Sequence, residues 1–230
     1  MTASERRVSE AVDENAGFIV PAGVTDLASF DRWVDSPDFP SRGRFSFLRG
    51  AVWADVSTED ALTHDCARLW VGLALGMITR NLDLGNYFGD RVRLRNEEVG
   101  FSTEPDGLMI SSHSSQAGRI RYPDETSAAS YTFAGAPDML LEVVSDASEK
   151  KDREILRDAY YRAGVTEYWI VDARPESPMI DVLSYGSRGF VASRRQAGGW
   201  VRSKLFGRSF RLLRSDATGG GQLFTLEHAD

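Results

Sequence analysis

One carboxylate, Glu142, interrupts the most apolar segment of the chain, PDMLLEVVS. The run from Met139 to Val144 predicts a strand that is buried on both faces of a sheet. Burial of a carboxylate is unfavourable unless the group is protonated, paired with a cation or bound to a metal. Glu142 therefore indicates a metal or catalytic site or, with equal weight, a structural ion pair with an arginine or lysine.

A metal ion at Glu142 would need a second carboxylate from a neighbouring strand. Asp138 shares the strand and the face of Glu142, but four residues of strand span ~13 Å, which is too far for one ion. Asp106 starts another apolar segment, TEPDGLMI, and Gly107 leaves room beside it. Two carboxylates on adjacent strands suit Mg²⁺, which prefers oxygen ligands and retains several waters. Taken alone, Asp106 would be interpreted as a turn residue of Pro-Asp-Gly.

A lysine stands at the start of the next predicted helix. Lys151 lies one turn before the apolar Ile155, so its ammonium is expected to project inward. The helix N-terminus also favours anions at this place. Asp152 precedes Leu156 by one turn and could orient Lys151 or a metal-bound water, whereas Lys150 points ~100° away. For each residue singly, a solvated helix start is the simpler interpretation.

Other polar residues carry weaker signals. Glu97 or Glu98 could supply a further carboxylate, although surface solvation is the more economical interpretation of both. His64 is predicted to be structural or exposed rather than catalytic, and neither His64 nor His113 belongs to a cluster with the spacing of zinc ligands. The sequence contains no phosphate-binding glycine loop and no dinucleotide fingerprint, and Ser145 has no nucleophile-elbow setting.

The elements that carry these residues alternate between extended and helical patterns. Ser145, Asp146 or Ser148 can cap the helix after PDMLLEVVS, and Gly164 can end it. TEYWIVDA follows as a strongly apolar strand, so the three segments predict a parallel strand–helix–strand unit. Short antiparallel strands are expected over residues 179–186, 189–196 and 200–207.

The first part of the chain predicts two helices with a strand pair between them. Thr25 can cap a helix over residues 25–36, and two strands flank Arg49-Gly50. A longer helix is expected from Ser57 or Thr58 to about Arg80. Its apolar stripe is expected to be buried and comprises Leu62, Leu69, Leu73, Met77 and Ile78. The predicted architecture is α/β, a mixed β-sheet flanked by helices.

Composition limits the kind of protein. The chain has 230 residues, 42% of them hydrophobic, and no run approaches the ~18 apolar residues of a membrane span. The polar residues 1–20 predict a flexible N-terminal arm before a single domain over 21–230. Cys66 is the only cysteine, which rules out an intrachain disulfide and agrees with a cytoplasmic location.

The charge is unevenly distributed along the chain. A net charge of −7 argues mildly against a protein that tracks a phosphate backbone. The segment from Arg188 to Arg214 is nevertheless rich in arginine and contains no Asp or Glu. It predicts either a basic patch or, equally well, an ordinary solvated β-region.

The segment PDMLLEVVSDASEKKDREILRDAYYRAGVTEYWIVDAR resembles the hallmark segment of the Uma-type restriction endonucleases, members of the PD-(D/E)XK nuclease superfamily. RLRNEEVGFSTEPDG resembles the first acidic strand of that family, and GGWVRSKLFGRSFRL resembles one branch of it. The likeness runs from roughly Phe45 to Leu213, and its EVVS…YRAGVTEYWIVDA core is fairly specific. The resemblance implies a restriction-endonuclease-like fold, Mg²⁺ or Mn²⁺ as cofactor, and hydrolysis of phosphodiester bonds in nucleic acid, with DNA expected.

The superfamily pattern, an aspartate followed by Glu-x-Lys, assigns the two acidic, metal-binding roles to Asp106 and Glu142. The lysine position of that pattern holds Val144. Members of the family place the lysine on the following helix, many of them at the position of Leu156, so Lys151 is the expected substitute. Asp138, Asp152 and Glu98 are then candidates for the surrounding shell of the site.

An alternative from another class is a catalytically degenerate nucleic-acid- or protein-binding module on the same fold, which Val144 and the acidic net charge favour. If Glu142 only pairs with an arginine, the protein would be structural. Cutting of both strands by one site per chain would favour a homodimer.

Overall fold

The computed structural model describes residues 19–56, 61–89, 91–123 and 131–230, with the side chains of residues 61 and 62 excepted. The arm predicted for residues 1–20 lies outside the described residues except for its last two. The helix cap predicted at Ser57 or Thr58 also lies outside them. None of the described helices is long and apolar enough to cross a lipid bilayer.

The helical segments are α1 (Leu27–Val34), η1 (Ala61–Asp65), α2 (Cys66–Asn81), α3 (Ser112–Gln116), η2 (Lys151–Leu156), α4 (Arg157–Ala163) and η3 (Ala197–Gly199). Both η1 and η2 are π-helical turns that continue directly into α2 and α4. The short η3 is a 3₁₀ turn.

The strands form three sheets. The first sheet has the order β2 (Ala51–Asp55), β1 (Arg44–Leu48), β5 (Phe101–Thr103), β4 (Arg93–Asn96), β8 (Thr132–Gly135) and β7 (Ile120–Arg121). The second sheet has the order β12 (Gly189–Ala192), β11 (Met179–Gly186), β10 (Glu167–Asp172), β9 (Met139–Val143), β6 (Gly107–Ser111) and β3 (Gly85–Phe88). The third comprises β13 (Val201–Ser203), β14 (Arg208–Asp216) and β15 (Gln222–Ala229).

The first two sheets are mixed, since β4 pairs with β8 in parallel and β9 pairs with β10 in parallel, whereas their other pairs are antiparallel. The predicted α/β class with a mixed sheet flanked by helices is thus confirmed. The β9–η2–α4–β10 segment is the predicted parallel unit. The expected strand pair around Arg49-Gly50 is the β1–β2 hairpin, in which both turn residues have positive φ, 53° and 75°.

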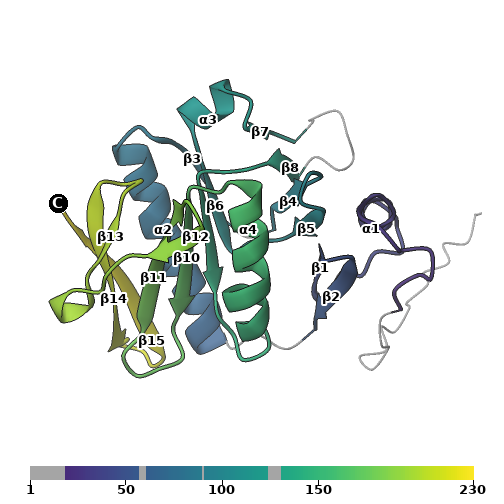
Figure 1. Cartoon of the computed structure of the whole chain (residues 1–230). Coiled ribbons are helices and arrows are strands. Elements are labelled where there is room, and N and C mark those ends of the chain that lie inside the picture. The colour runs from purple at the N-terminus through teal and green to yellow at the C-terminus, as the bar shows by residue number, and fades with distance from the viewer. Residues whose placement is uncertain (1–18, 57–60, 90, 124–130) are drawn as a thin grey trace, which may run out of the picture.

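The second sheet lies between two apolar cores. Figure 1 shows α2 behind this sheet and α4 in front of it. Leu141 and Val143 belong to the core that α2 and the third sheet cover. Leu140 and Val144 belong to the core that α4 and the first sheet cover. Every residue of β9 is buried, so the prediction of a strand buried on both faces is confirmed.

Local capping determines the ends of the helix that follows β9. The Ser145 amide donates to Ser148 Oγ at 2.9 Å, and the Ser148 amide donates back to Ser145 Oγ at 3.1 Å. This reciprocal pair satisfies two amides at the start of the helix. Gly164 ends the helix in the left-handed conformation, with φ 82°, as predicted for a C-terminal glycine.

Two helix predictions are corrected. Thr25 does not cap α1; Asp26 does, because its carboxylate accepts the Ser29 amide at 2.7 Å. The stripe predicted to be buried on α2 is wrong in part, since Leu69, Leu73 and Met77 are exposed. The buried residues of this helix are Ala67, Val71, Leu75, Ile78 and Thr79. Both sides of α2 are apolar, so periodicity alone did not determine which side the sheets cover.

The third sheet is anchored by a second buried carboxylate. Glu167 is fully buried in β10 and accepts hydrogen bonds from Ser203 Oγ at 2.7 Å, the Lys204 amide at 2.7 Å, the Leu205 amide at 3.1 Å and Trp169 Nε1 at 3.0 Å. The Lys204 and Leu205 amides belong to the turn between β13 and β14. The carboxylate therefore joins the third sheet to the second.

We expect Glu167→Ala to lower the free energy of unfolding by about 2 to 4 kcal/mol, because it leaves several buried donors without an acceptor. Urea denaturation followed by tryptophan fluorescence measures the change. Glu154→Ala, which alters an exposed residue of the same charge, is the control and should change stability by less than about 0.5 kcal/mol. Equal midpoints for the two variants would contradict the anchoring role.

The end of β10 carries an ion-pair network with a predicted pH dependence. Hydrogen bonds from Arg174 hold the pKa of Asp172 below its ordinary value. Arg174 Nη2 donates to Asp172 Oδ2 at 2.8 Å, and Arg153 Nη2 donates to the same oxygen at 2.9 Å. A lowered folded-state pKa means that the stabilisation is complete above the unfolded-state pKa of about 3.9 and is lost as pH falls through the folded-state value. Between about pH 5 and pH 3, the unfolding free energy of the wild type should fall more steeply than that of Asp172→Asn. Parallel curves from urea titrations would refute this.

Candidate active site

The register of β6 and β9 places Asp106 across from Glu142. The strands are antiparallel, and Gly107 pairs with Leu141, so the next pair outward is Asp106 and Glu142. Directly opposed residues of this kind have Cβ atoms about 4.5–5.5 Å apart on the same face. The two carboxylates thus come from two different strands, 36 residues apart in the chain (142 − 106), and lie side by side.

Both oxygens of Asp106 are engaged at the strand ends. Its Oδ2 accepts the Val143 amide at 2.7 Å, and its Oδ1 accepts Arg44 Nη1 at 2.9 Å. Gly107 is required beside it, because a Cβ there would lie 2.1 Å from the Tyr87 hydroxyl. The guanidinium of the candidate site thus contacts Asp106, whereas the sequence alone suggested an arginine or lysine at the glutamate.

The partner of Glu142 is a tyrosine. Tyr160 donates its hydroxyl to Glu142 Oε1 at 2.7 Å, and both residues are buried. Burial, followed by the negative charges of Asp152 and Asp106, raises the pKa of Glu142 well above its ordinary value, although Lys151 and the Tyr160 hydrogen bond oppose this. Glu142 therefore lies in a place where nearby positive charge would strongly favour its ionised form.

Lys151 and Asp152 complete the group from the start of η2. Lys151 Nζ is 3.5 Å from Asp152 Oδ1, and Ser148 Oγ donates to Asp152 Oδ2 at 2.5 Å. Burial raises the pKa of Asp152 to about 6, against the opposing charge of Lys151. Burial by itself lowers the pKa of Lys151. The negative charges of Asp152, Glu142 and Asp106 raise it by more, so the pKa lies above its ordinary value. The ammonium therefore stays protonated at neutral pH.

The helix start that carries Lys151 is π-helical. In a π-helix, backbone hydrogen bonds link residues that are five apart in sequence. Lys151 therefore lies one π-helical turn before Leu156. Lys151 and Leu156 thus lie on related faces of the same helix. Leu156 is fully buried in the apolar core, whereas the side chain of Lys151 is 14% exposed at its edge. Single π-turns occur frequently at functional sites.

A second π-turn, η1, brings His64 to the same place. His64 Nε2 lies 2.7 Å from Val143 O and 3.9 Å from Asp106 Oδ2, and the ring is buried. The sequence favoured a structural or exposed histidine, because nothing local links η1 to the end of β9. Arg44 was missed for the same reason. Tyr160 could have been found, since it lies four residues after Leu156, on the apolar side of the helix, where a buried hydroxyl needs a partner.

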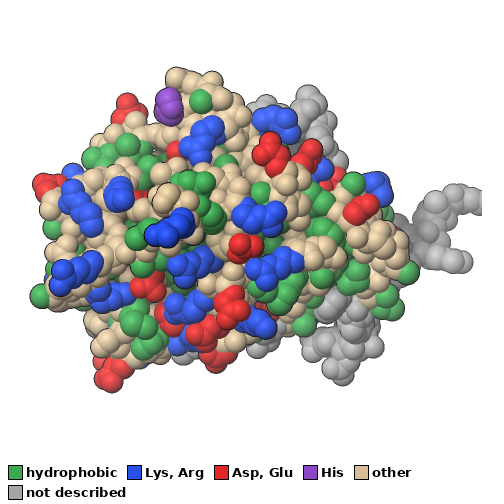
Figure 2. Space-filling model, in the orientation of Figure 1, with side chains coloured by type: hydrophobic (Ala, Val, Ile, Leu, Met, Phe, Trp, Pro, Cys, Tyr) green, Lys and Arg blue, Asp and Glu red, His purple; other side chains and the backbone are tan. Residues whose placement is uncertain are grey.

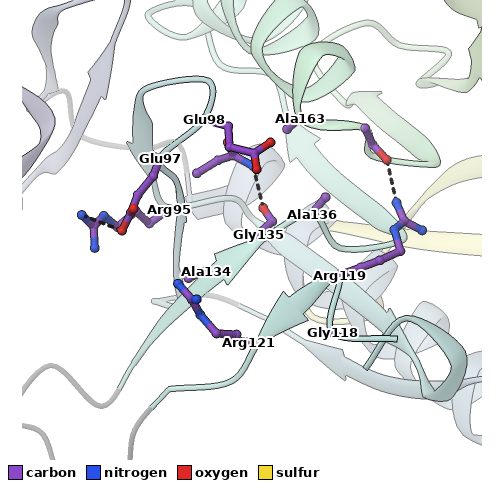
Figure 3. Close-up of a pocket in the computed structure, with 12 residues that line it drawn as sticks. Arg95, Glu97, Glu98, Gly118, Arg119, Arg121, Ala134, Gly135, Ala136 and Ala163 are labelled. Atoms are coloured by element: carbon purple, nitrogen blue, oxygen red, sulfur yellow. Dashed lines mark hydrogen bonds and ion pairs between the residues drawn. The ribbon is translucent and has the colours of Figure 1, made fainter. Parts of the chain in front are cut away.

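The structure does not bring two other sequence candidates to this group. Asp138 lies at the start of β9 and accepts the Ser111 amide at 2.7 Å and Ser114 Oγ at 2.8 Å, so it secures the turn into α3. Glu98 lines a separate cavity of about 470 Å³, together with Glu97. Figure 3 shows that cavity, where Arg95, Arg119 and Arg121 also project. His113 is exposed on α3.

The candidate site adjoins open space on two sides. Asp106, Arg68 and Tyr87 line a groove of about 350 Å³ beside α2. Lys151 and Arg44 line a smaller cavity of about 70 Å³ under β2. Asp106 therefore borders the groove, whereas Glu142 lines neither space and lies behind it, 2% exposed.

The donor set fits a hard divalent cation held by few protein ligands. Among the described residues, no group of three or more His, Cys, Asp or Glu side chains surrounds one point. The fit therefore rests on pairs of carboxylates with water completing the coordination, as Mg²⁺ prefers. Asp152 Oδ1 is buried and has only the Lys151 ammonium near it, at 3.5 Å. At Asp106 Oδ1, the Arg44 guanidinium already supplies a positive charge.

Basic side chains gather on one face of the molecule. Figure 2 shows Lys and Arg side chains over α4 and β11 to β13, with carboxylates among them. In the Arg188–Arg214 segment, Arg195 contacts Asp181 at 2.8 Å and Arg211 contacts Glu227 at 2.6 Å. Within the described part of the chain, the side chains of Arg188, Arg194, Arg202 and Lys204 form no ion pair with a carboxylate. The segment thus contributes uncompensated positive charge to this face.

Comparison with known proteins supports a nuclease fold. The Uma2 family, described as "Putative restriction endonuclease", matches residues 27–212. The crystal structure of "a putative nuclease belonging to DUF820 from Anabaena variabilis ATCC 29413" superimposes with a TM-score of 0.58 and 17% sequence identity, covering 79% of this chain and 90% of that chain. No curated protein matches the chain. At this identity the structural likeness establishes the fold alone.

We expect Tyr160→Phe to destabilise the protein by about 1 to 3 kcal/mol, because Glu142 Oε1 is left buried without a donor. Thermal and urea unfolding measure the effect. Tyr161→Phe is the matched control: its hydroxyl donates to Gly186 O at 3.0 Å from a part-buried position, so water can replace that bond. A loss for Tyr160→Phe no larger than for the control would show that Glu142 does not depend on this hydroxyl.

Proposed function

The chain belongs to the Uma2 family of restriction endonucleases, and from this premise we propose that it is a metal-dependent endonuclease that cleaves phosphodiester bonds of DNA. The observation that carries the proposal is the pairing of Asp106 and Glu142 on opposed strands next to the ammonium of Lys151. This combination supplies oxygen ligands and a fixed positive charge at one place. Phosphodiester hydrolysis needs both.

Asp106 and Glu142 are the proposed ligands of Mg²⁺ or Mn²⁺. Tyr160 holds Oε1 of Glu142, which leaves Oε2 as the ligand atom. The cation would polarise a phosphate oxygen and lower the pKa of a bound water. A bound cation would favour ionised Glu142, because its charge would offset the burial and the neighbouring negative charges that raise the pKa of Glu142.

Lys151 stabilises the negative charge that develops on the phosphate. Its ammonium is held by Asp152 at 3.5 Å, and Ser148 in turn holds Asp152 at 2.5 Å. We assign Asp152 a positioning role for this reason. His64 contacts Val143 O at 2.7 Å and so fixes the backbone at the end of β9. This contact holds Glu142 in place beside Asp106, which accepts the Val143 amide.

The uncompensated arginines of the Arg188–Arg214 segment support a nucleic-acid substrate, since cationic side chains neutralise backbone phosphates. The net charge of −7 argues mildly against nucleic-acid binding. The local positive charge of this face counts for more, because only the face that contacts the phosphates determines the attraction. We place the protein in the cytoplasm on the basis of Cys66, the only cysteine, which is free.

The direct test is cleavage of plasmid DNA and of a structured RNA with Mg²⁺ or Mn²⁺, compared with excess chelator. We expect metal-dependent cleavage of DNA and a loss of about 100-fold or more for Glu142→Gln, Asp106→Asn and Lys151→Met, because each removes a ligand or the stabilising charge. Glu98→Gln is the matched control and should retain the wild-type rate, since Glu98 lies in a separate cavity.

A metal-binding measurement separates the enzyme from a degenerate module. Mn²⁺ should raise the melting temperature of the wild type and of Lys151→Met, but not of Glu142→Gln, because only the last loses a ligand. Nucleic-acid binding without cleavage by the wild type would favour the non-catalytic module. Cleavage that persists in Glu142→Gln would remove the assignment of the site.

A further inference from the structure

Helix α2 is apolar on two sides, and the chain covers only one of them. Its inner residues pack against the second and third sheets. On the other side, Leu69, Leu73 and Met77 are 64%, 50% and 57% exposed, and we call these three residues the outer stripe. A helix that is apolar all round is normally covered all round, and a contiguous exposed apolar patch marks an interaction surface.

We propose that the outer stripe is an interface between two copies of this chain, which pair through antiparallel α2 helices about a two-fold axis at Leu73. The occupant of the stripe is therefore the stripe of the second copy. Homodimers with such an axis require a surface that is complementary to itself.

The stripe has this self-complementarity. Leu69 and Met77 each lie four residues from Leu73, so the axis places Leu69 of one copy against Met77 of the second and Leu73 against its own equivalent. The three residues are four apart in sequence, which makes them one continuous ridge along the helix. Two copies can bring these ridges together where the helices cross at the axis.

Charges at the two ends of α2 favour the antiparallel arrangement. Asp65 precedes Leu73 by eight residues and Arg80 follows it by seven, so Arg80 of one copy comes to the Asp65 end of the other. Arg80 is exposed, and within the described residues no carboxylate contact is recorded for it. The Asp65 side chain remains 38% exposed even though Arg68 contacts it at 2.8 Å. A parallel pair would instead place Arg80 against Arg80, which is unfavourable.

The groove beside the stripe offers room for a side chain of the second copy. Leu69, Gly72, Leu73 and Tyr87 line this groove of about 350 Å³. Met77 of the second copy faces Leu69 in the proposed arrangement, and its flexible, unbranched side chain can fill an irregular gap. The groove also reaches Asp106. The two candidate sites would therefore lie on either side of one axis, which under the proposed function suits one cut in each strand of a duplex.

The first test is the mass of the full-length protein in solution by sedimentation equilibrium. We expect twice the mass of one chain for the wild type and the mass of one chain for Leu73→Asp, because that change opposes two carboxylates on the axis. Val191→Asp is the matched control: Val191 is 62% exposed on β12, and its variant should remain a dimer. A wild type with the mass of one chain, or equal dissociation of the control, would overturn the proposal.

The second test needs no destabilising charge. Cys66 is the only cysteine, so the double variant Cys66→Ser/Leu73→Cys has one thiol, which the axis places against its equivalent. Under mild oxidation it should form a disulfide-linked dimer at least ten times faster than Cys66→Ser/Val191→Cys. Equal rates for the two variants would refute an axis at Leu73. Neither test uses cleavage, so the interface and the nuclease activity can fail separately.

Discussion

The antiparallel register of β6 and β9 is the constraint on which the candidate site depends. Gly107 pairs with Leu141, and the Val143 amide donates to Asp106 at 2.7 Å, so the two carboxylates must project from the same face. A slip of one residue would turn one of them into the core behind the sheet. The site is therefore a property of strand pairing, and the apolar side chains of β9, buried on both faces, hold that pairing.

Burial then determines the chemistry of the carboxylates. Glu142, Asp152 and Asp106 share a place that little water reaches, so burial and mutual repulsion raise the pKa of the first two. Lys151 is the positive charge that this group most needs. Hydroxyl donors hold one oxygen each of Glu142 and Asp152. The three carboxylates still exceed the single positive charge of Lys151, and a hard cation would reduce this excess of negative charge. The fold thus agrees with the metal chemistry expected for the family.

The two π-helical turns show how helices deliver residues to this sheet end. The turn η2 presents Lys151 and Asp152, and η1 presents His64, each where its helix meets the ends of β9 and β6. A wider turn moves side chains to positions that a regular helix would not offer. The turn η2 thus presents Lys151 at the edge of the core that contains the buried Leu156.

The sequence by itself determined which residues had to be buried or satisfied. Local pattern singled out Glu142 within an apolar run, Asp106 before Gly107 and Lys151 on an inward helix face as candidates, and it predicted the parallel unit of β9 and β10. Local pattern did not reveal the partners Arg44 and His64. It also predicted Leu69, Leu73 and Met77 of α2 as buried although they are exposed, and it left Asp138 and Glu98 as candidates that the structure places elsewhere. These outcomes depend on contacts between segments far apart in the chain, and periodicity specifies the face of an element without specifying which distant element covers it.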